Sequence, residues 1–156
     1  ATIEVVVESE VLHPFCPRFI AVSNDDHEDG RLDLCCTDNG IELRVNNKRV
    51  VHMSNNGCST NKREVIHAVI DSTQGASDDR VEIYFDGASI NAPNNQGSLA
   101  KDETIAIGDE SYLVIGNRMN QDRSLWGRVY YAAIYKVAFD AQRAQAHADA
   151  LLKSDD

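Results

Sequence analysis

Residues 80–90 read RVEIYFDGASI, and residues 112–140 read YLVIGNRMNQDRSLWGRVYYAAIYKVAFD. In the first segment, apolar and polar side chains alternate over residues 81–85, which is typical of a strand with one buried face. Asp86-Gly87 follows directly and suits the positive-φ positions of a tight turn, so a return strand is expected over residues 88–90. The first segment therefore predicts a β-hairpin.

The second segment holds two further strand patterns. Residues 112–115 form a short apolar run closed by Gly116-Asn117, and residues 127–137 form the longest β-rich run of the chain. In this long run one face would carry Val129, Tyr131, Ala133 and Tyr135, and the other Tyr130, Ala132 and Ile134. A strand that is apolar on both faces is typical of the middle of a packed fold. We therefore expect residues 127–137 at the centre of a sandwich.

The rest of the chain reads as short strands joined by turns rich in Gly, Asn and Asp, over residues 2–8, 18–23, 31–37, 41–45, 49–53 and 64–72. In residues 2–8, Glu4 and Glu8 point outward, but Val6 on the same face indicates that this face is partly covered. Asp140 is a good N-cap for a helix over residues 141–152, whose thin apolar face must dock on a sheet. The pattern predicts an all-β fold, an antiparallel two-sheet β-sandwich (jelly roll) with a short C-terminal helix.

Several of these segments also resemble a known family. The sequence YFDG at residues 84–87, LVIGN at 113–117 and WG at 126–127, together with the closing helix, resembles laminin-G-like, concanavalin A-like jelly-roll domains. Further upstream, TIEV at residues 2–5 and RFIAVSN at 18–24 resemble earlier strands of that family. All of these motifs are structural, so the resemblance covers most of the chain but implies no catalytic signature.

The resemblance also bears on domain organisation. It implies one laminin-G-like domain over residues 1–156. Family members usually carry one or more strands before the segment that resembles TIEV. We therefore expect the N-terminal strand to be either missing or supplied by a partner chain, which would cover the sheet edge beside residues 2–8.

The composition limits the classes of partner. The chain has 25 Asp and Glu against 15 Lys and Arg, a formal net charge of −10. Nucleic acid and anionic membranes bind through basic patches, so neither is an expected partner. No apolar run approaches the roughly 18 residues of a membrane-spanning helix. These features fit a secreted or cell-surface protein.

The four cysteines, Cys16, Cys35, Cys36 and Cys58, lack the paired spacing of a zinc site. Cys35 and Cys36 are adjacent in a predicted strand and point to opposite faces, which disfavours a bridge between them. We expect two disulfides, each joining one of these two residues to Cys16 or Cys58, with buried free thiols as the alternative.

Candidate metal ligands gather in the turn that follows residues 18–23. Asn24, Asp25, Asp26 and Asp29 offer several of the oxygen ligands that calcium needs, although His27 and Glu28 interrupt the rhythm of a calcium-binding loop. Members of the resembled family often bind calcium at the rim of the sandwich. Asp78-Asp79 and Asp109-Glu110 are further options. The alternative reading is a solvated turn without a cation.

Candidate ligand-binding residues lie in the polar segment 118–125 and at Trp126 directly after it. Trp126 could stack on a sugar ring while Asn120 and Arg123 bond to hydroxyl groups, with Tyr84 and Tyr130 as further aromatic candidates. Each of these aromatic side chains could instead serve packing alone. A jelly-roll glucanase would need alternating acids on one strand, and Glu82 with Asp86 lacks the third acid.

The sequence thus predicts a non-catalytic extracellular recognition or adhesion module that binds a glycan or a protein, with calcium as an optional cofactor. The alternative function is a structural subunit of an extracellular assembly or filament, a homo-oligomer joined through strand complementation at a sheet edge.

Overall fold

The computed structural model describes residues 1–12, 15–24, 32–37, 40–54, 57–90, 99–105, 107, 109, 111–117 and 123–153. Its elements in chain order are β1 (Thr2–Ser9), β2 (Arg18–Asn24), β3 (Leu32–Thr37), β4 (Gly40–Val45), β5 (Lys48–Ser54), β6 (Arg63–Ile70), the 3₁₀ helix η1 (Ser77–Asp79), β7 (Val81–Phe85), β8 (Ala88–Ser89), β9 (Ser111–Ile115), β10 (Gly127–Tyr135) and α1 (Ala141–Leu152).

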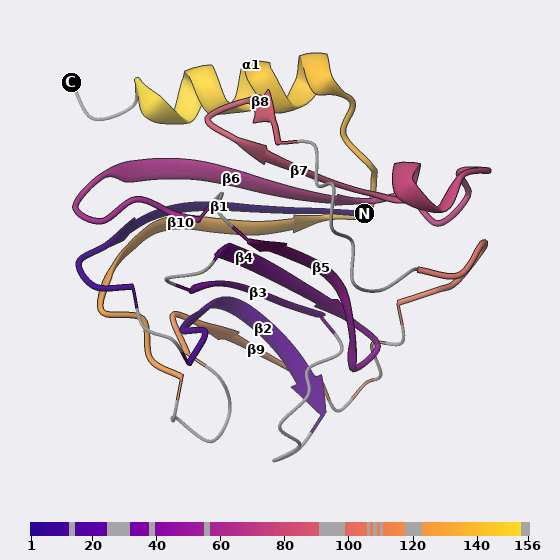
Figure 1. Ribbon diagram of the computed structural model, residues 1–156, viewed down its shortest axis with the longest axis horizontal. Helices are drawn as coiled ribbons and strands as arrows, with labels where there is room; N and C mark the ends of the chain where they lie inside the picture. Colours follow the sequence, from indigo (N-terminus) through magenta and orange to yellow (C-terminus); the bar gives the residue numbers. More distant parts are fainter. Residues whose placement is uncertain are drawn as a thin grey trace.

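The strands form two stacked sheets of five strands each, and α1 lies across the outer face of one of them (Figure 1). Sheet A has the order β10-β1-β6-β7-β8, and sheet B has the order β5-β4-β3-β2-β9. Neighbouring strands pair antiparallel in both sheets. The predicted all-β jelly-roll sandwich with a C-terminal helix is confirmed.

The main core lies between the sheets. It takes one face of each central strand, including Ile3, Val5 and Val7 of β1, Leu32 and Leu34 of β3, Ile41 and Leu43 of β4, and Ile66 and Ala68 of β6. Smaller apolar clusters lie between sheet A and α1, where Ala144 and Ala148 of the helix are buried. The covered outer face that Val6 indicated is thus the face under α1, and Glu4 is buried there with it.

The predicted position of the β10 strand is wrong. β10 pairs only with β1 in the described sheet, so it is an edge strand, and most of its side chains are partly or fully exposed. The strands in the middle of sheet A are β1 and β6. A strand that is apolar on both faces indicates that its side chains are uncharged. It does not show whether the strand is central or at an edge, because the neighbours of a strand are set by long-range pairing.

The faces of β10 also differ from the prediction at one point. The β1–β10 register shifts between Val6 and Val7, which pair with Tyr131 and Val129, so Tyr130 is an extra residue in the ladder. Beyond this β-bulge the side-chain alternation is reversed. As a result, Val129 packs with the main core and not on the face of Tyr131 and Tyr135.

The N-terminal strand has neighbours on both sides. β1 pairs along its length with β10 and with β6, so neither of its edges is open. The edge that we expected a partner to cover beside residues 2–8 is covered by the chain itself. Among the described strands, the edge strands at which another strand could add are β10 and β8 of sheet A and β5 and β9 of sheet B.

The β1–β10 contact supplies a test of the fold. At Gly127 a Cβ would lie 2.0 Å from the Glu8 carbonyl oxygen, whereas at Gly75 it would meet nothing within 4 Å. We expect Gly127→Ala to lower the free energy of unfolding by about 2 kcal/mol or more, because the two backbones must separate. Gly75→Ala should change it by less than about 0.5 kcal/mol. Urea melts of both variants measure this, and equal stability of the two would contradict the β10 placement.

Candidate functional site

The two sheets differ in what covers their outer faces. The outer face of sheet A is occupied by α1, whereas no described helix covers the outer face of sheet B (Figure 1). On sheet B the core side is taken by Leu32, Leu34 and Cys36, so Asp33 and Cys35 point to the outer face. The outer face of sheet B is nevertheless buried along β3, where Asp33 and Cys35 are 1% and 0% exposed.

Two disulfides hold β3 from opposite sides. Cys35 on the outer face bonds to Cys16, which precedes β2, and Cys36 on the core face bonds to Cys58, which precedes β6. This is one of the pairings left open by the sequence, with each adjacent cysteine bridged to a distant one. Because the two side chains leave β3 in opposite directions, one bridge fixes a surface segment and the other a core segment.

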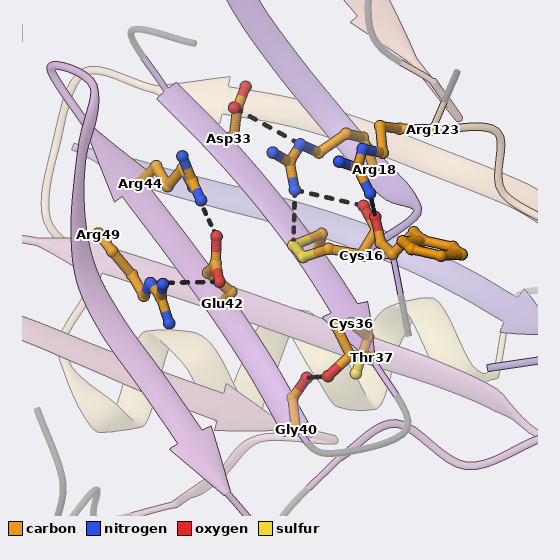
Figure 2. Close-up of a disulfide and its surroundings, with 12 residues drawn as sticks. Cys16, Arg18, Asp33, Cys36, Thr37, Gly40, Glu42, Arg44, Arg49 and Arg123 are labelled. Atoms are coloured by element: carbon orange, nitrogen blue, oxygen red, sulfur yellow. Dashed lines mark hydrogen bonds and ion pairs between the residues drawn. A yellow bond between two sulfur atoms is a disulfide. The ribbon is translucent and has the colours of Figure 1, made fainter. Parts of the chain in front are cut away.

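Next to the outer bridge lies a buried ion pair (Figure 2). Arg18 Nε is 3.5 Å from Asp33 Oδ2, and Arg18 Nη1 donates to the Cys16 carbonyl oxygen at 3.2 Å and to Cys35 Sγ at 3.0 Å. Arg18 and Asp33 are 3% and 1% exposed. Buried charges of this kind need partners, so this cluster is a rigid structural element of the face.

A second polar cluster lies further across the same face, toward β5. Glu42 accepts from Arg44 through one carboxylate oxygen and lies 3.4 Å from Arg49 Nε through the other (Figure 2). Arg44 and Arg49 are more exposed than Glu42. The two clusters lie side by side on β3 and β4, because Asp33 is opposite Arg44 and Cys35 is opposite Glu42 in the antiparallel pairing.

The rim beside the outer bridge carries aromatic side chains. Trp126 and Phe15 are 62% and 61% exposed, the highest values among the large apolar side chains of the described chain. They belong to two segments that are joined by backbone hydrogen bonds from Glu10 to Trp126 and from Arg18 to Arg123. We call Phe15, Arg123 and Trp126 the aromatic rim.

Arg123 connects the two segments of the rim. Its Nη1 donates to the Phe15 carbonyl oxygen, and its guanidinium carbon lies 5.7 Å from the centre of the Phe15 ring. Its Nε is buried and has no hydrogen-bond partner within the described structure. An arginine held in this way presents a fixed cationic group beside an exposed aromatic ring, which suits a ligand with hydroxyl or carboxylate oxygens.

The structure places the predicted ligand residues in different regions. Trp126 and Arg123 belong to the same rim segment, and Asn120 lies outside the described residues. Tyr84 is 1% exposed under α1, so its prediction as a surface platform is wrong. Tyr130 lies on the exposed edge strand, where its hydroxyl donates to Glu8. Sequence reasoning missed Phe15, which stands alone between polar and proline residues and gives no pattern.

The predicted calcium ligands are largely untested. Asp25, Asp26 and Asp29 lie outside the described residues, and Asn24 is the last residue of β2. Among the described residues, the one cluster with metal-ligand spacing is Cys16, Cys35 and Glu42, and its two cysteines are bonded to each other. A disulfide offers no thiolate, so this cluster is not a metal site.

A cavity of about 680 Å³ lies between η1, β7 and the start of α1. Asp71, Asp78, Asp79, Glu82 and Asp140 line it. Three of these carboxylates already serve the fold, since Asp140 caps α1, Asp71 closes a turn at Thr73 and Glu82 accepts from Ser89. This acidic cavity is therefore less suited to a ligand than the rim.

A charged cluster lies between sheet A and α1. Glu4 Oε2 is 2.8 Å from His147 Nδ1 and 3.4 Å from His67 Nε2, and both Glu4 and His67 are buried. The rings of Phe139 and Tyr135 pack against His147. Burial raises the pKa of Glu4, but its bonds and charge interactions with His67 and His147 outweigh this and leave the pKa lowered. The cluster thus holds α1 on the sheet.

The fold is similar to those of several solved structures, although the sequence itself has no match. No protein-family model and no curated protein matches the sequence. Solved structures do: the heptameric SAP-like pentraxin of Limulus polyphemus (TM-score 0.67, 14% identity) covers 94% of this chain and 68% of its own. The Ruminococcus gnavus IT-sialidase CBM40 bound to α2,3-sialyllactose (TM-score 0.66, 12% identity) covers 94% of this chain and 81% of its own.

A Trypanosoma rangeli sialidase in complex with sialic acid is also similar (TM-score 0.66, 10% identity), but this chain spans 23% of that protein's length. At these identities the likeness shows the fold alone. It supports a jelly-roll sandwich, and the laminin-G-like, concanavalin A-like family assignment stays a prediction. Within the described residues, no helix has the length and apolarity needed to cross a membrane.

The Glu4 cluster predicts a pH-dependent stability. Because folding lowers the pKa of Glu4, its ionisation stabilises the fold above the ordinary carboxyl value of 4.5, and this contribution is lost as the pH falls below it. We expect Glu4→Gln to lower the free energy of unfolding by about 2 kcal/mol at neutral pH, and by clearly less in acid. Urea melts at several pH values measure this; a difference independent of pH would contradict it.

The outer disulfide gives a separate prediction. Cys16 and Cys35 are 19 residues apart in the sequence, so their bridge should stabilise the fold by about 3 kcal/mol through the unfolded chain. The double variant Cys16→Ala/Cys35→Ala should therefore melt at a lower temperature. Its circular dichroism spectrum at low temperature should still show the helical signal of α1. An unchanged melting temperature would contradict the bridge, and thiol titration of the denatured native protein provides the control.

Proposed function

We propose that the protein is a non-catalytic recognition module of the extracellular space that binds a glycan at the aromatic rim. The observation that carries the proposal is the exposed Phe15 ring beside the positioned guanidinium of Arg123, with the exposed Trp126 on the same segment as Arg123. Sugar rings offer an apolar face for stacking and hydroxyl groups for hydrogen bonds. The rim provides groups for both.

Exposure of these aromatic rings costs free energy in water unless something covers them. An apolar side chain loses roughly 25 cal/mol for each square ångström left in water. Single exposed apolar residues are common, but Phe15 lies beside a fixed arginine, and Trp126 is exposed on the segment that carries this arginine. A sugar ring is of the size and polarity to cover it, which supports glycan binding.

The structural neighbours support the same class of ligand. One is titled as a CBM40 bound to α2,3-sialyllactose, and another is a sialidase in complex with sialic acid. We take sialylated glycans as the first probes for this chain, because Arg123 could pair with their carboxylate. The two disulfides fit a secreted or cell-surface location, where thiols are oxidised.

The acids of the β7 region give no support for glycoside hydrolysis. Glu82 accepts a hydrogen bond from Ser89, and Asp86 accepts from the Val65 amide and from Lys62. Both carboxylates therefore already have partners within the fold. Calcium at residues 24–29 stays part of the proposal as a structural or ligand-bridging cation. Comparing glycan binding with and without a chelator tests it, since loss of binding on chelation would require the cation.

The rim predicts the effect of substitution. We expect Trp126→Ala and Phe15→Ala each to weaken glycan binding about tenfold or more, because each removes an exposed ring from the contact. Trp126→Phe should retain most of the affinity. A glycan array selects the ligand, and titration calorimetry measures the dissociation constants of the variants.

The matched control is Leu152→Ala, which removes an exposed apolar side chain from α1 and should leave the dissociation constant unchanged. Melting temperatures of all variants should stay near that of the native protein, because both rings are exposed. Absence of binding to any glycan, or equal affinity of Trp126→Ala and the native protein, would reject the proposal.

A further inference from the structure

The two disulfides of β3 lie in different surroundings. In the inner bridge, Cys36 and Cys58 are 0% and 4% exposed and belong to the apolar core between the sheets. In the outer bridge, Cys35 is also fully buried, but its partner Cys16 is partly exposed. Of the four cysteines, Cys16 is therefore the one that a molecule in solution reaches most readily.

A cation lies beside the other sulfur of the outer bridge. Arg18 Nη1 donates to Cys35 Sγ at 3.0 Å, and this arginine is 3% exposed (Figure 2). A guanidinium in contact with a cysteine sulfur stabilises the thiolate, and more strongly where water is excluded. In the inner bridge, Cys36 Sγ accepts from the neutral Cys58 amide among apolar side chains. A thiolate is therefore stabilised at Cys35 and disfavoured at Cys36.

The acidic groups near the outer bridge are compensated. Asp33 pairs with Arg18 at Nε, so Nη1 remains directed at the sulfur. A Glu42 carboxylate oxygen lies within 4.8 Å of both sulfurs of the bridge and would oppose a thiolate. Arg44 and Arg49 both pair with Glu42, however. Three guanidinium groups thus face two carboxylates, which leaves a net positive charge beside the sulfurs.

We propose that the outer disulfide is a site of thiol–disulfide exchange. The thiolate of a small thiol or of a dithiol protein attacks Cys16 Sγ and forms a new sulfur–sulfur bond there. The bond between Cys16 and Cys35 breaks, and its electron pair leaves on Cys35 Sγ as a thiolate that Arg18 already contacts. A second thiol of the reductant then attacks the mixed disulfide. This step oxidises the two reductant thiols to a disulfide and leaves Cys16 as a thiol, which takes its proton from water.

The surroundings of the bridge determine which sulfur is attacked and which leaves. Exchange is fastest when the attacked sulfur is accessible and the leaving sulfur forms the more stable thiolate. Exposure and the position of Arg18 give the same assignment, with Cys16 attacked and Cys35 leaving. The inner bridge meets neither condition, so it remains as a covalent link between β3 and the segment before β6.

Exchange loosens the segment that the outer bridge anchors. Cys16 has a φ of 55°, a left-handed conformation that its surroundings must hold. Without the bridge, the segment keeps the hydrogen bonds from Arg18 to the Cys16 carbonyl oxygen and from Arg123 to the Phe15 carbonyl oxygen. The chemistry is independent of glycan binding at the rim, although Phe15 belongs to the segment that is loosened.

Reaction of the full native chain with reduced glutathione tests the proposal. Samples are quenched in acid, denatured and alkylated, and peptide mass spectrometry locates each free or glutathione-bound cysteine. We expect the outer bridge to open at least about tenfold faster than the inner bridge, with glutathione on Cys16 and the free thiol on Cys35. No exchange at either bridge, equal rates at both, or glutathione mainly on Cys35 would each overturn the proposal.

The double variant Arg18→Met/Asp33→Leu tests the role of the cation. It removes both members of the buried ion pair, which proteins tolerate better than the loss of one member. We expect its outer bridge to open at least about fivefold more slowly than in the native protein, with the inner bridge still protected, because the leaving thiolate loses its cation.

The matched control is Arg128→Met/Glu8→Gln, which removes an ion pair of sheet A and should leave the rate at the outer bridge unchanged. An outer bridge that opens as fast in Arg18→Met/Asp33→Leu as in the native protein would contradict the role of Arg18. If that variant does not fold, its inner bridge opens as well, and the comparison of the two bridges in the native protein decides the proposal.

Discussion

The central position of β1 is the constraint on which the rest of the structure depends. Of its eight residues, all but Glu8 are buried, because β10 and β6 flank the strand, sheet B covers one face and α1 covers the other. The inward face can be filled with valine and isoleucine alone. The face under α1 contains Glu4, and a carboxylate excluded from water needs compensating partners. His67 of β6 and His147 of α1 provide them, so the helix is held by a polar contact as well as by small apolar ones.

The same arrangement determines which surfaces remain for function. The helix uses the outer face of sheet A, and the ion pair of Arg18 with Asp33 occupies part of the outer face of sheet B. Among the described residues, exposed apolar side chains remain at the aromatic rim and along β9 and β10. The proposed recognition site therefore uses side chains that neither the helix nor the ion pair needs.

Most strands were predictable because their pattern is local, and the limits of the prediction have the same origin. Alternation over residues 81–85 and the Asp86-Gly87 turn define a hairpin from a few neighbouring residues. The edge position of β10 depends on its pairing with β1, more than a hundred residues away, and no local pattern reports it. Tyr84 was misplaced for a related reason, because only the docking of α1 makes the outer face of sheet A a buried one. At the rim, Trp126 and Arg123 were found by residue type, whereas Phe15 joins them only through the long-range contact with Arg123.

The outer disulfide connects the fold to the proposed recognition. Cys16 has a φ of 55°, a left-handed conformation that costs free energy for a residue with a side chain and persists only when the surroundings hold it. Its bond to Cys35 and the hydrogen bond from Arg18 to its carbonyl oxygen do so, and both anchor the segment that presents Phe15. Binding a sugar yields little free energy per contact, so a mobile segment would lose much of it when the ligand orders the loop. A segment fixed before the ligand arrives avoids that cost, which explains why a small, partly exposed site would lie directly beside a disulfide and a buried ion pair.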